Sequence, residues 1–458
     1  MAESDLMEKI VSLCKRRGFV FPGSEIYGGL SGTFDYGPLG VELKNNIAQL
    51  WWRLFVQDRD DMCGIDSAIL MNPRVWEASG HVNGFNDPLV EDRVTKKRYR
   101  ADHILEEHGI DPAGMTLAQM GEAIQEHGIK GPDGNELSAP QQFNMMFKTS
   151  VGSVDGSDTA IYLRPETAQG MFINFKNILD AYHPKLPFGI AQIGRAFRNE
   201  IAPRDFIFRV RELEIMEFEY FIDEKDWQES FEYWREQFHA WFAALGFSSD
   251  DIREVEIGDG DRAHYSRRTI DFHFRYPHKF DEIGGLAYRT DYDLKKHIEA
   301  SGVDLSYLTS AGSRFIPHVI EPTFGLGRHV LAVIAKAYSE DELGGEHRTF
   351  LKFPVHLAPI KAAVFPLLKN KPELVEKARE VYLMLKKQVP QVMWDDNGNI
   401  GKRYRRQDEI GTPWCITVDF DTLGEKPELK NTVTIRDRDT GEQERIAIGE
   451  LVSYLQRS

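Results

Sequence analysis

Two apolar runs on either side of a fairly long loop constrain the fold of this chain most strongly. Residues 187–198 carry Phe188, Ile190 and Ile193, residues 206–221 are rich in Phe, Val and Ile, and the segment between them contains Pro203. Two such runs joined by a loop predict an antiparallel β-hairpin. Residues 269–275, 284–289 and 318–320 also have strand-like composition, and we expect them to extend the same antiparallel sheet.

Helices are expected next to this sheet in the first three quarters of the chain. Residues 41–56 place Leu43, Ile47, Leu50 and Leu54 at helical spacing, which predicts an amphipathic helix. The other elements expected here are helices over residues 6–17, 170–175 and 226–245, and a strand over residues 67–71 that Pro73 ends. An antiparallel sheet flanked by helices predicts an α+β domain, which we assign to residues 1–350.

Residues 91–151 differ in composition from the segments around them. They are charged, contain the turn-forming sequence GPDGN at residues 131–135, and carry one helical pattern at about residues 117–127. A long segment of this kind between regular elements is typical of an insertion. We therefore predict a helical or irregular subdomain inserted into the α+β domain.

The pattern changes after residues 353–354. Strand-like runs at residues 362–368, 392–395, 414–420 and 431–436 alternate with a helix over residues 372–388 and a helix or loop over residues 401–407. Alternating strands and helices predict a mixed α/β layer. We place the boundary near residues 349–354, so that residues 351–458 form a second, C-terminal α/β domain.

The net charge of −16 argues against a general nucleic-acid binder, but the charge is unevenly distributed. From Leu351 to the C-terminus there are 18 Lys and Arg against 16 Asp and Glu, so the acidity lies in the first three quarters of the chain. The last quarter contains a basic group formed by Lys402, Arg403, Tyr404, Arg405 and Arg406. Considered alone, this group is best explained as a solvated helix face.

Several classes of protein are excluded by the composition. No apolar run approaches the roughly 18 residues that a membrane span requires, so no membrane partner is expected. The acidic N-terminus argues against a secretory signal and an Arg-rich transit peptide, and we expect a cytoplasmic protein. Cys14, Cys63 and Cys415 form no C-x-x-C pair, so we expect neither a disulfide framework nor bound zinc.

Two arginines next to turns indicate how the chain could hold a nucleotide. Arg198 ends the first apolar run, and Arg328 follows Gly325 and Gly327 at the start of another apolar run. The chain contains no G-x-x-x-x-G-K-[ST] sequence, so a P-loop cannot supply the phosphate contacts. Two positioned guanidinium groups can hold a bent nucleoside triphosphate instead.

Four motifs, in order along the chain, resemble the class II aminoacyl-tRNA synthetases. Residues 69–73 (ILMNP) are similar to the proline-ended motif 1, Arg198 and Glu200 with the hairpin to motif 2, and Gly325, Gly327 and Arg328 to motif 3. The fourth similarity is to the homodimeric glycyl-tRNA synthetases, through residues 164–170 (RPETAQG), 198–204 (RNEIAPR), 321–325 (EPTFG) and 399–413 (NIGKRYRRQDEIGTP). The resemblance runs nearly from end to end. It implies a homodimer that activates glycine with ATP and transfers it to the 3′ adenosine of tRNA(Gly).

The resemblance also implies an ATP site. In it Arg198 holds the α-phosphate, Phe208 stacks on adenine and Arg328 clamps the far phosphate, while Glu282 binds Mg²⁺, a cation that prefers oxygen ligands. Glu200 accepts the adenine amino group, because a residue two positions after Arg198 in a strand points to the same face. We take Arg198, Arg328 and Glu282 as the catalytic residues. The implied ATP-binding set is Arg198, Asn199, Glu200, Phe208, Arg209, Val210, Arg211, Glu212, Leu213, Glu282, Ile283, Gly325, Leu326, Gly327 and Arg328.

Glycine offers only an ammonium group and a carboxylate for recognition. By resemblance, Glu166, Glu217 and Glu321 line the amino-acid pocket, and a buried group of carboxylates is a suitable trap for an ammonium ion. A larger substrate would be excluded by steric crowding. The implied glycine-binding set is Arg100, Glu166, Leu213, Glu214, Ile215, Met216, Glu217, Glu321, Pro322, Thr323, Phe324 and Gly325, with Arg98 as an alternative to Arg100.

The pocket departs from the family pattern at three positions. Relatives usually carry serine where Thr323 stands, and often Phe and Gln where Leu213 and Ile215 stand. The hydroxyl group survives at position 323, but its added methyl group would tighten the pocket. We therefore expect the pocket to be repacked.

With the resemblance, the basic group Lys402, Arg403, Tyr404, Arg405 and Arg406 is assigned to the tRNA anticodon, since arginine and aromatic groups together suit single-stranded bases. One alternative is a class II relative that adenylates a small acid without tRNA, and the C-terminal resemblance argues against it. Another is a non-enzymatic module on the same fold. Catalytically dead relatives typically lose the motif arginines, whereas Arg198 and Arg328 are both present.

Overall fold

The computed structural model describes residues 3–112, 114–152, 160–260, 262–263 and 265–457. Its largest sheet has seven strands in the order β11-β12-β13-β16-β10-β9-β3. All neighbouring pairs are antiparallel except β3 and β9, which are parallel. The strands are β3 (Met62–Gly64), β9 (Phe188–Phe197), β10 (Glu212–Ile222), β11 (Ile252–Glu256), β12 (Arg268–Arg275), β13 (Phe280–Thr290) and β16 (His318–Gly325). The predicted antiparallel sheet of an α+β domain is therefore confirmed.

The hairpin of β9 and β10 is shorter than the sequence predicts. The register pairs Phe197 with Glu212, so β10 begins six residues after the expected start at residue 206. Asp205 and Phe206 have φ values of 57° and 59°. A strand cannot contain this left-handed backbone, and residues 198–211 therefore form a loop beside the end of the sheet.

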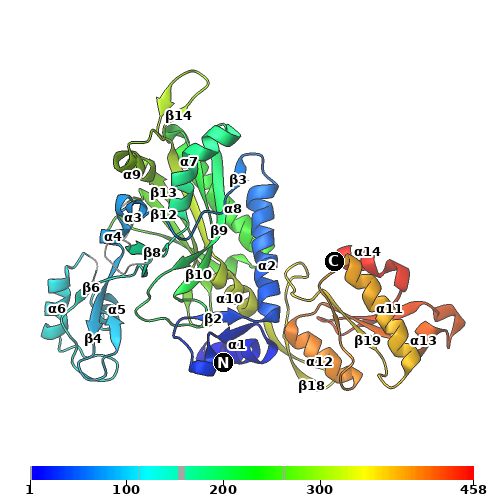
Figure 1. The fold of residues 1–458 in the computed structure, drawn as a ribbon. Helices are drawn as coiled ribbons and strands as arrows, with labels where there is room; N and C mark the ends of the chain where they lie inside the picture. Colours follow the sequence, from blue (N-terminus) through cyan, green and yellow to red (C-terminus); the bar gives the residue numbers. More distant parts are fainter. Residues whose placement is uncertain (1–2, 113, 153–159, 261, 264, 458) are drawn as a thin grey trace.

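Helices cover the two faces of the sheet unequally (Figure 1). On one face α2 (Pro38–Trp52), α8 (Trp227–Ala244) and α10 (Leu326–Ala337) bury an aromatic core that includes Trp51, Phe218, Phe238 and Phe324. On the other face α7 (Ala168–Tyr182) and α9 (Tyr292–Ser301) pack around Phe221 at one end. The other end of that face stays open to a cavity.

The N-terminal region closes the bottom of this domain in Figure 1. The further elements of the domain are α1 (Glu3–Arg17), β1 (Val20–Pro22), β2 (Phe34–Tyr36), α3 (Pro73–Ala78), α4 (His81–Gly84), β7 (Lys148–Ser150), β8 (Ala160–Tyr162), β14 (Tyr307–Leu308) and β15 (Arg314–Phe315). The prediction of a strand over residues 67–71 is wrong, because only Leu70 forms a β-bridge there, with Leu163. Asn72 instead caps α3, accepting a hydrogen bond from the backbone of Arg74.

The inserted segment is more regular than expected. It contains a three-stranded sheet in the order β5-β4-β6, made of β4 (Asn86–Glu91), β5 (Arg98–Arg100) and β6 (Gln141–Asn144). The predicted helix is present as α6 (Leu117–Glu126), and a second helix, α5 (Ala101–Glu107), packs beside it. Val90, Leu105 and Ile124 belong to a separate small core, so the insertion folds around its own apolar residues and begins before residue 91.

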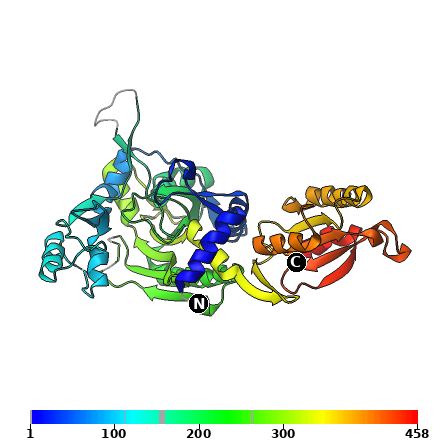
Figure 2. The ribbon, with the colours of Figure 1, turned by 90° about the horizontal axis from the view of Figure 1, so that it is seen from below.

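A second sheet forms the C-terminal α/β region. Its order is β20-β19-β21-β22-β23, with β19 parallel to β20 and β21 and the remaining pairs antiparallel, which confirms the mixed sheet. The elements are β19 (Ala362–Pro366), α11 (Pro372–Gln388), β20 (Val392–Trp394), α12 (Ile400–Ile410), β21 (Trp414–Val418), α13 (Phe420–Leu423), β22 (Thr432–Asp437), β23 (Gln443–Ala447) and α14 (Leu451–Arg457). Figures 1 and 2 show this region and the insertion on opposite sides of the large sheet.

A hairpin of β17 (Tyr338–Leu343) and β18 (Glu346–Leu351) joins the two sheets. Its Arg348 is buried, pairs with Asp341 at 2.5 Å and Asp408 at 3.4 Å, and donates to the carbonyl of Arg438 at 2.6 Å. These contacts tie the hairpin to the C-terminal region. Among the described helices, none is long and apolar enough to cross a membrane.

Candidate active site

A cavity of about 640 Å³ lies at the open end of the large sheet, between the loop after β9, the strand β2 and the start of α10. Most of the predicted ATP residues line it, namely Arg198, Glu200, Phe208, Arg209, Val210, Glu212, Leu213, Glu282, Gly325, Gly327 and Arg328. Of the predicted glycine residues, Glu214, Ile215 and Thr323 line it as well, besides Leu213 and Gly325, which belong to both predicted sets. Segments more than a hundred residues apart in the sequence therefore meet in one cavity.

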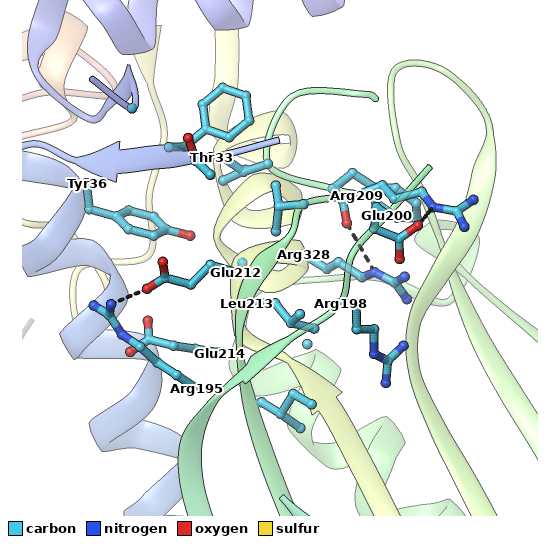
Figure 3. A pocket seen from close by; sticks show the side chains of 18 of the residues that line it. Thr33, Tyr36, Arg195, Arg198, Glu200, Arg209, Glu212, Leu213, Glu214 and Arg328 are labelled. Carbon is cyan, nitrogen blue, oxygen red and sulfur yellow. Dashed lines mark hydrogen bonds and ion pairs between the residues drawn. The ribbon is translucent and has the colours of Figure 1, made fainter. Parts of the chain in front are cut away.

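Arg198 is held in a single orientation at the end of β9. Its Nε donates to the carbonyl of Pro165 at 3.1 Å, and its guanidinium lies 5.5 Å from the centroid of the Phe85 ring. None of the described residues accepts a hydrogen bond from its two terminal nitrogens. Figure 3 shows the guanidinium groups of Arg198 and Arg328 on the same side of the cavity as Glu200. Two cationic groups thus face one region in which phosphates can be bound.

Arg328 stands on the first turn of α10 and contacts both Glu282 and Phe208. Its Nη1 lies 2.9 Å from the Glu282 carboxylate and donates to the Glu282 carbonyl at 3.1 Å. Its guanidinium also lies 4.5 Å from the centroid of the Phe208 ring. The charge of Arg328 lowers the pKa of Glu282 despite the opposing effect of burial. Arg328 and Glu282 therefore form a charged pair on the cavity wall.

Glu200 is positioned differently from the prediction. The segment after Phe197 is not a strand, and Glu200 follows Arg198 in a tight turn in which its N–H donates to the Arg198 carbonyl at 2.7 Å. Its side chain still lines the cavity and accepts from Nε of Arg209 at 2.7 Å. Arg211 lies outside the cavity and donates to the carbonyls of Glu200 and Ser31. These arginines therefore shape the loop after β9.

On the opposite wall of the cavity, two predicted glutamates pair with cations that the sequence did not indicate. Glu214 pairs with Lys44 of α2, and Glu212 pairs with Arg195. Figure 3 shows Glu212 and Glu214 beside Tyr36, across the cavity from Arg198. On this wall both carboxylates are therefore paired with cations, whereas on the opposite side Arg198 keeps two terminal nitrogens that no described residue bonds.

The predicted carboxylates lie just beyond Thr323, buried under the cavity. Both oxygens of Glu217 accept hydrogen bonds, from Thr323 Oγ1 at 2.8 Å and Thr167 Oγ1 at 2.5 Å. Glu321 accepts from Nη1 of Arg289 at 2.6 Å. Glu217, Glu321 and the unpredicted Glu219 each place one oxygen within 4.8 Å of the others. We call these three residues the carboxylate cluster.

Glu166 borders the carboxylate cluster from the turn before α7. It accepts from Nε2 of Gln169 at 2.9 Å and lies 3.3 Å from Nε2 of His81. Although burial opposes ionisation, His81, the charge of Arg289 and the bond from Gln169 hold the pKa of Glu166 well below its usual range. Glu166 therefore carries a negative charge at neutral pH.

Arg289 of β13 is fully buried between α9 and the carboxylate cluster. It makes a two-pronged contact with Asp293, through Nε and Nη2 at 2.8 Å each, besides its bond to Glu321. Its guanidinium also lies 3.8 Å from the centroid of the Tyr265 ring. Burial raises the pKa of Glu217 and Glu321, and the neighbouring carboxylates add to the effect while Arg289 opposes it. The cluster thus carries more acidic groups than this guanidinium can neutralise.

Five predicted residues turn away from the site. Alternation along the strands sends Met216, Pro322, Phe324 and Ile283 to the opposite face of the sheet, and the first turn of α10 buries Leu326 in the same core. Their side chains therefore cannot bind ATP or glycine, and these five assignments are wrong for the side chains. Asn199 does not line the cavity either, and its backbone N–H donates to the carbonyl of Met145 at 2.7 Å.

Arg100 does not line the cavity. It pairs with Asp87 at 2.8 Å and Asp102 at 2.5 Å within the insertion. The alternative, Arg98, is exposed and pairs with Glu91. In this arrangement neither arginine reaches the carboxylates of the site.

The basic group on α12 is only partly available to a ligand. Arg403 is 1% exposed and donates to the carbonyls of Pro366, Asp396 and Gly398, because it lies on the buried stripe of the helix. Tyr404 packs between Phe365 and Arg436 and shares a hydrogen bond with Thr417 at 2.8 Å. The prediction that the Arg403 side chain contacts tRNA is therefore wrong for this arrangement, whereas Tyr404 is half-buried and its contact with tRNA stays a prediction. Lys402 is exposed, and Arg405 and Arg406 pair with Glu346 and Asp395.

Sequence patterns did contain signals for the missed residues. Glu219 stands two residues after the predicted Glu217, in the apolar second half of the strand, which places both carboxylates on one face. Arg289 ends an apolar strand four residues before Asp293, the spacing of a helical ion pair. Charged residues within apolar runs were therefore the sequence signal for these buried groups of the site.

A divalent cation would find oxygen ligands at one edge of the cavity. Asp271 of β12 lies on the strand next to Glu282, and burial together with the charge of Glu282 raises the pKa of Asp271. A carboxylate beside another that disfavours its ionisation suits a hard cation with oxygen ligands. The residues present therefore fit Mg²⁺.

Known proteins resemble this chain over nearly its whole length. The tRNA synthetase class II core domain (G, H, P, S and T) matches residues 147–337, and the anticodon binding domain matches residues 361–458. The chain is 48% identical to the glycine–tRNA ligase of Bacillus cereus over 460 residues, 50% to that of Geobacillus kaustophilus over 460 residues and 46% to that of Thermus thermophilus over 495 residues. In each case 98% of both chains is covered.

The chain belongs to the glycine–tRNA ligase family. The predicted resemblance to the class II synthetases is thereby confirmed. The segment that matches the class II core domain contains Arg198, Glu282 and Arg328 and ends with α10. The anticodon-binding match covers all five strands of the second sheet. Both predicted regions therefore correspond to known parts of a class II synthetase.

Proposed function

We propose that the cavity beside Arg198 and Arg328 is where this glycine–tRNA ligase activates glycine and transfers it to tRNA. The family assignment supplies the reaction, in which ATP and glycine give glycyl-adenylate and pyrophosphate before glycine passes to the 3′ adenosine of tRNA. The observation that carries the location is that two guanidinium groups line one cavity, and that Thr323, which also lines it, donates to Glu217 of a buried set of carboxylates.

Activation joins two anions, so the site has to offset charge and align the reactants. The glycine carboxylate oxygen attacks the α-phosphorus of ATP, and the bond to the pyrophosphate oxygen breaks on the opposite side. No general base is required, because a carboxylate is already ionised at neutral pH. Arg198 presents its free terminal nitrogens to the cavity, and we assign it to the α-phosphate, where charge develops. Its anchors on Pro165 and Phe85 fix the direction of this contact.

Arg328 and Phe208 would change their contact when ATP binds. The guanidinium lies 4.5 Å from the ring centroid, which leaves no room for a base between them. Adenine can therefore stack on Phe208 only if Arg328 moves off the ring. We assign the displaced guanidinium to the far phosphate of ATP and Glu200, freed from Arg209, to the adenine amino group.

Glycine would bind beside Thr323, above the carboxylate cluster. Glu166, Glu217 and Glu321 supply acceptors for its ammonium group. The strand opposite Thr323 and Glu321 presents Gly285 and Ala287 at this level of the sheet, so the small residues leave space for a substrate without a side chain. A larger amino acid would meet Thr323 and the buried carboxylates.

Mg²⁺ would be held by Glu282 and Asp271, which border the region assigned to the phosphates. When bound there, the cation would neutralise part of the phosphate charge. Glu282 remains paired with Arg328 on its other side, so the carboxylate also limits how far Arg328 can move.

The second step needs tRNA to reach from the C-terminal region to the cavity. We assign the anticodon contact to Lys402, Arg405 and Arg406, the members of the basic group whose side chains lie at the surface of α12. Arg403 and Tyr404 would support this surface from below. Exposed cations bind the nucleic-acid backbone with little sequence preference, so base recognition would come from neighbouring groups.

We also propose that the chain acts as a homodimer in the cytoplasm. The similarity of residues 69–73 to motif 1, the interface segment of the class II family, supports the dimer. Light scattering coupled to gel filtration would give twice the chain mass of 52.5 kDa if the proposal is right. A mass of one chain at micromolar concentration would contradict it.

The assignment of the cavity is tested by charging of tRNA(Gly) with labelled glycine. Wild-type protein should charge the tRNA, and Arg198→Ala should lower the rate by at least about a hundredfold, the usual cost of losing one contact to developing charge. Arg195→Ala, which removes an ion-paired arginine on the opposite wall, is the matched control and should retain most of the rate. Near-normal charging by Arg198→Ala would overturn the role of this arginine.

A further inference from the structure

Glu219 is the most unusual side chain of the carboxylate cluster. It is 0% exposed, and neither of its carboxylate oxygens has a hydrogen-bond partner among the described residues. Buried carboxylates are nearly always bonded, because an unpaired charge in the protein interior is strongly disfavoured. Glu219 therefore either lacks its charge or receives a cation that is part of the protein's function.

The position of Glu219 connects it with the proposed glycine site. It lies two residues after Glu217 in β10, on the same face of the strand. The register of β10 and β16 pairs Glu217 with Thr323 and Tyr220 with Ile320, which places Glu219 opposite Glu321. Glu219 therefore lies two residues further along β10 from the cavity than Glu217, below the position that we assign to the ammonium group.

Negative groups face Glu219 from several elements. The cluster members Glu217 of β10 and Glu321 of β16 are closest. The other acidic groups are Asp293 of α9, whose charge acts on Glu219, and Glu166 before α7. Arg289 of β13 is the opposing cation. Of the nearby histidines, His81 borders Glu166 and His297 borders Gln169. Tyr265 stacks on Arg289. Arg289 already bonds Asp293 and Glu321, so it leaves Glu217 and Glu219 uncompensated.

We propose that Glu219 carries a proton while the glycine site is empty and releases it when an ammonium group enters the carboxylate cluster. Glu219 is then a positioning residue, whose ionisation is coupled to glycine binding through Glu217 and Glu321. This inference rests on the proposed function, because it takes the ammonium group of glycine as the entering cation.

The charge balance supports this coupling. Like charges in a low-dielectric site cannot all ionise, and burial together with the charge of Glu321 raises the pKa of Glu219 well above its usual range. An ammonium group adds one positive charge, which favours the ionised form of Glu219 and so the release of its proton. The protonated carboxyl and the glycine ammonium then give a carboxylate–ammonium contact, and the proton leaves to solvent. No other bond forms or breaks.

The test is calorimetric titration of the full chain with glycyl-sulfamoyl adenosine, a stable analogue of glycyl-adenylate. Titrations at pH 6.5 in buffers of different ionisation enthalpy report how many protons are released, and the ligand amine is already protonated at this pH. The wild-type protein should release close to one proton per site. Its affinity should rise with pH by up to about tenfold per unit while Glu219 is protonated in the free protein.

Two variants separate Glu219 from its neighbours. Glu219→Gln replaces the protonated carboxyl by a neutral group of the same shape, so it should bind the analogue with no proton release and no pH slope. Glu166→Gln removes a carboxylate that is already ionised, so it should bind more weakly but still release a proton.

The outcomes distinguish this inference from the proposed function. Binding of the analogue by the wild-type protein without proton release would overturn the role of Glu219 and leave the glycine site intact. No binding of the analogue by folded protein would overturn the proposed site itself. Mn²⁺ binding that is lost in Glu219→Gln and competes with the analogue would assign the cluster to a metal and would also overturn the inference.

Discussion

Replacing Arg289 by methionine should destabilise the large domain and weaken glycine binding together. Arg289→Met keeps most of the side-chain volume but removes three hydrogen bonds of 2.6 to 2.8 Å to Asp293 and Glu321. Asp293 would keep its bond from Gln169 at 3.0 Å. Removing one partner of a buried ion pair costs about 3 to 5 kcal/mol, because the other charge is left in the interior.

Urea unfolding followed by tryptophan fluorescence measures this loss. The large domain contains the buried Trp51, Trp234 and Trp241, so its unfolding has a direct signal. Arg314→Met is the matched control, because Arg314 pairs with Asp304 at an exposed site. Such a surface pair is worth at most about 1 kcal/mol. Arg289→Met should therefore shift the urea midpoint several times further than the control.

Glycine activation gives a second reading of the same change. Without the guanidinium, the pKa of Glu321 would rise further, since Arg289 is what opposes its rise. Fewer carboxylates would then be available to the ammonium group, and the KM for glycine should rise more than the KM for ATP. A loss of stability below about 1 kcal/mol, with an unchanged KM for glycine, would refute this account of Arg289.

Three further changes probe the other parts of the structure. The depressed pKa of Glu166 makes its contribution to stability fully present above the unfolded-state value of about 4.3 and progressively lost as the pH falls below it towards the folded-state pKa, so the difference in urea midpoint between Glu166→Gln and wild type should be largest at pH 7 and should shrink steadily below about pH 4.3. Arg348→Met removes the buried contacts of the β17–β18 hairpin with Asp408 of α12 and with the Arg438 carbonyl after β22, and it should speed proteolysis between residues 351 and 361 and reduce tRNA charging without changing pyrophosphate exchange. Lys402→Glu should raise the KM for tRNA severalfold, whereas Lys387→Glu on the exposed face of α11 should not, and equal effects of the two would argue against a local contact.

Much of the fold could be predicted from local patterns. The hairpin, the antiparallel sheet and the mixed C-terminal sheet follow from alternating and apolar runs that mark strands wherever one face is buried. The boundary of β10 could not be predicted, because the left-handed backbone at Asp205 and Phe206 is set by the loop packing and not by glycine. The small sheet of the insertion was missed because its strands are only three to six residues long and lie in a charged segment.

The site, like the fold, was only partly predictable from the sequence. The resemblance to the class II family predicted one site for Arg198, Glu282 and Arg328, and all three line the same cavity. It did not distinguish the side chains that face the cavity from those, such as Met216 and Phe324, that alternate into the core. That distinction needs the position of each residue in the sheet.

Burial of charged groups was the least predictable property. Arg403 belongs to a run of exposed-looking cations, yet the helical stripe that packs on the sheet includes it. Glu219 gains its importance from facing Glu321 across two strands, about a hundred residues apart in the chain. Such a pairing follows from the register and cannot be obtained from composition.

The most direct test of the central claim is exchange of labelled pyrophosphate into ATP without tRNA, run with glycine, alanine and serine in turn. The account predicts exchange with glycine alone, and its loss in Arg198→Ala, because the small site beside Thr323 and the phosphate contact of Arg198 act in the same step. Exchange with alanine or serine at a rate comparable to glycine would contradict the proposed exclusion of larger substrates. No exchange with any of the three by folded protein would contradict glycine activation in this cavity.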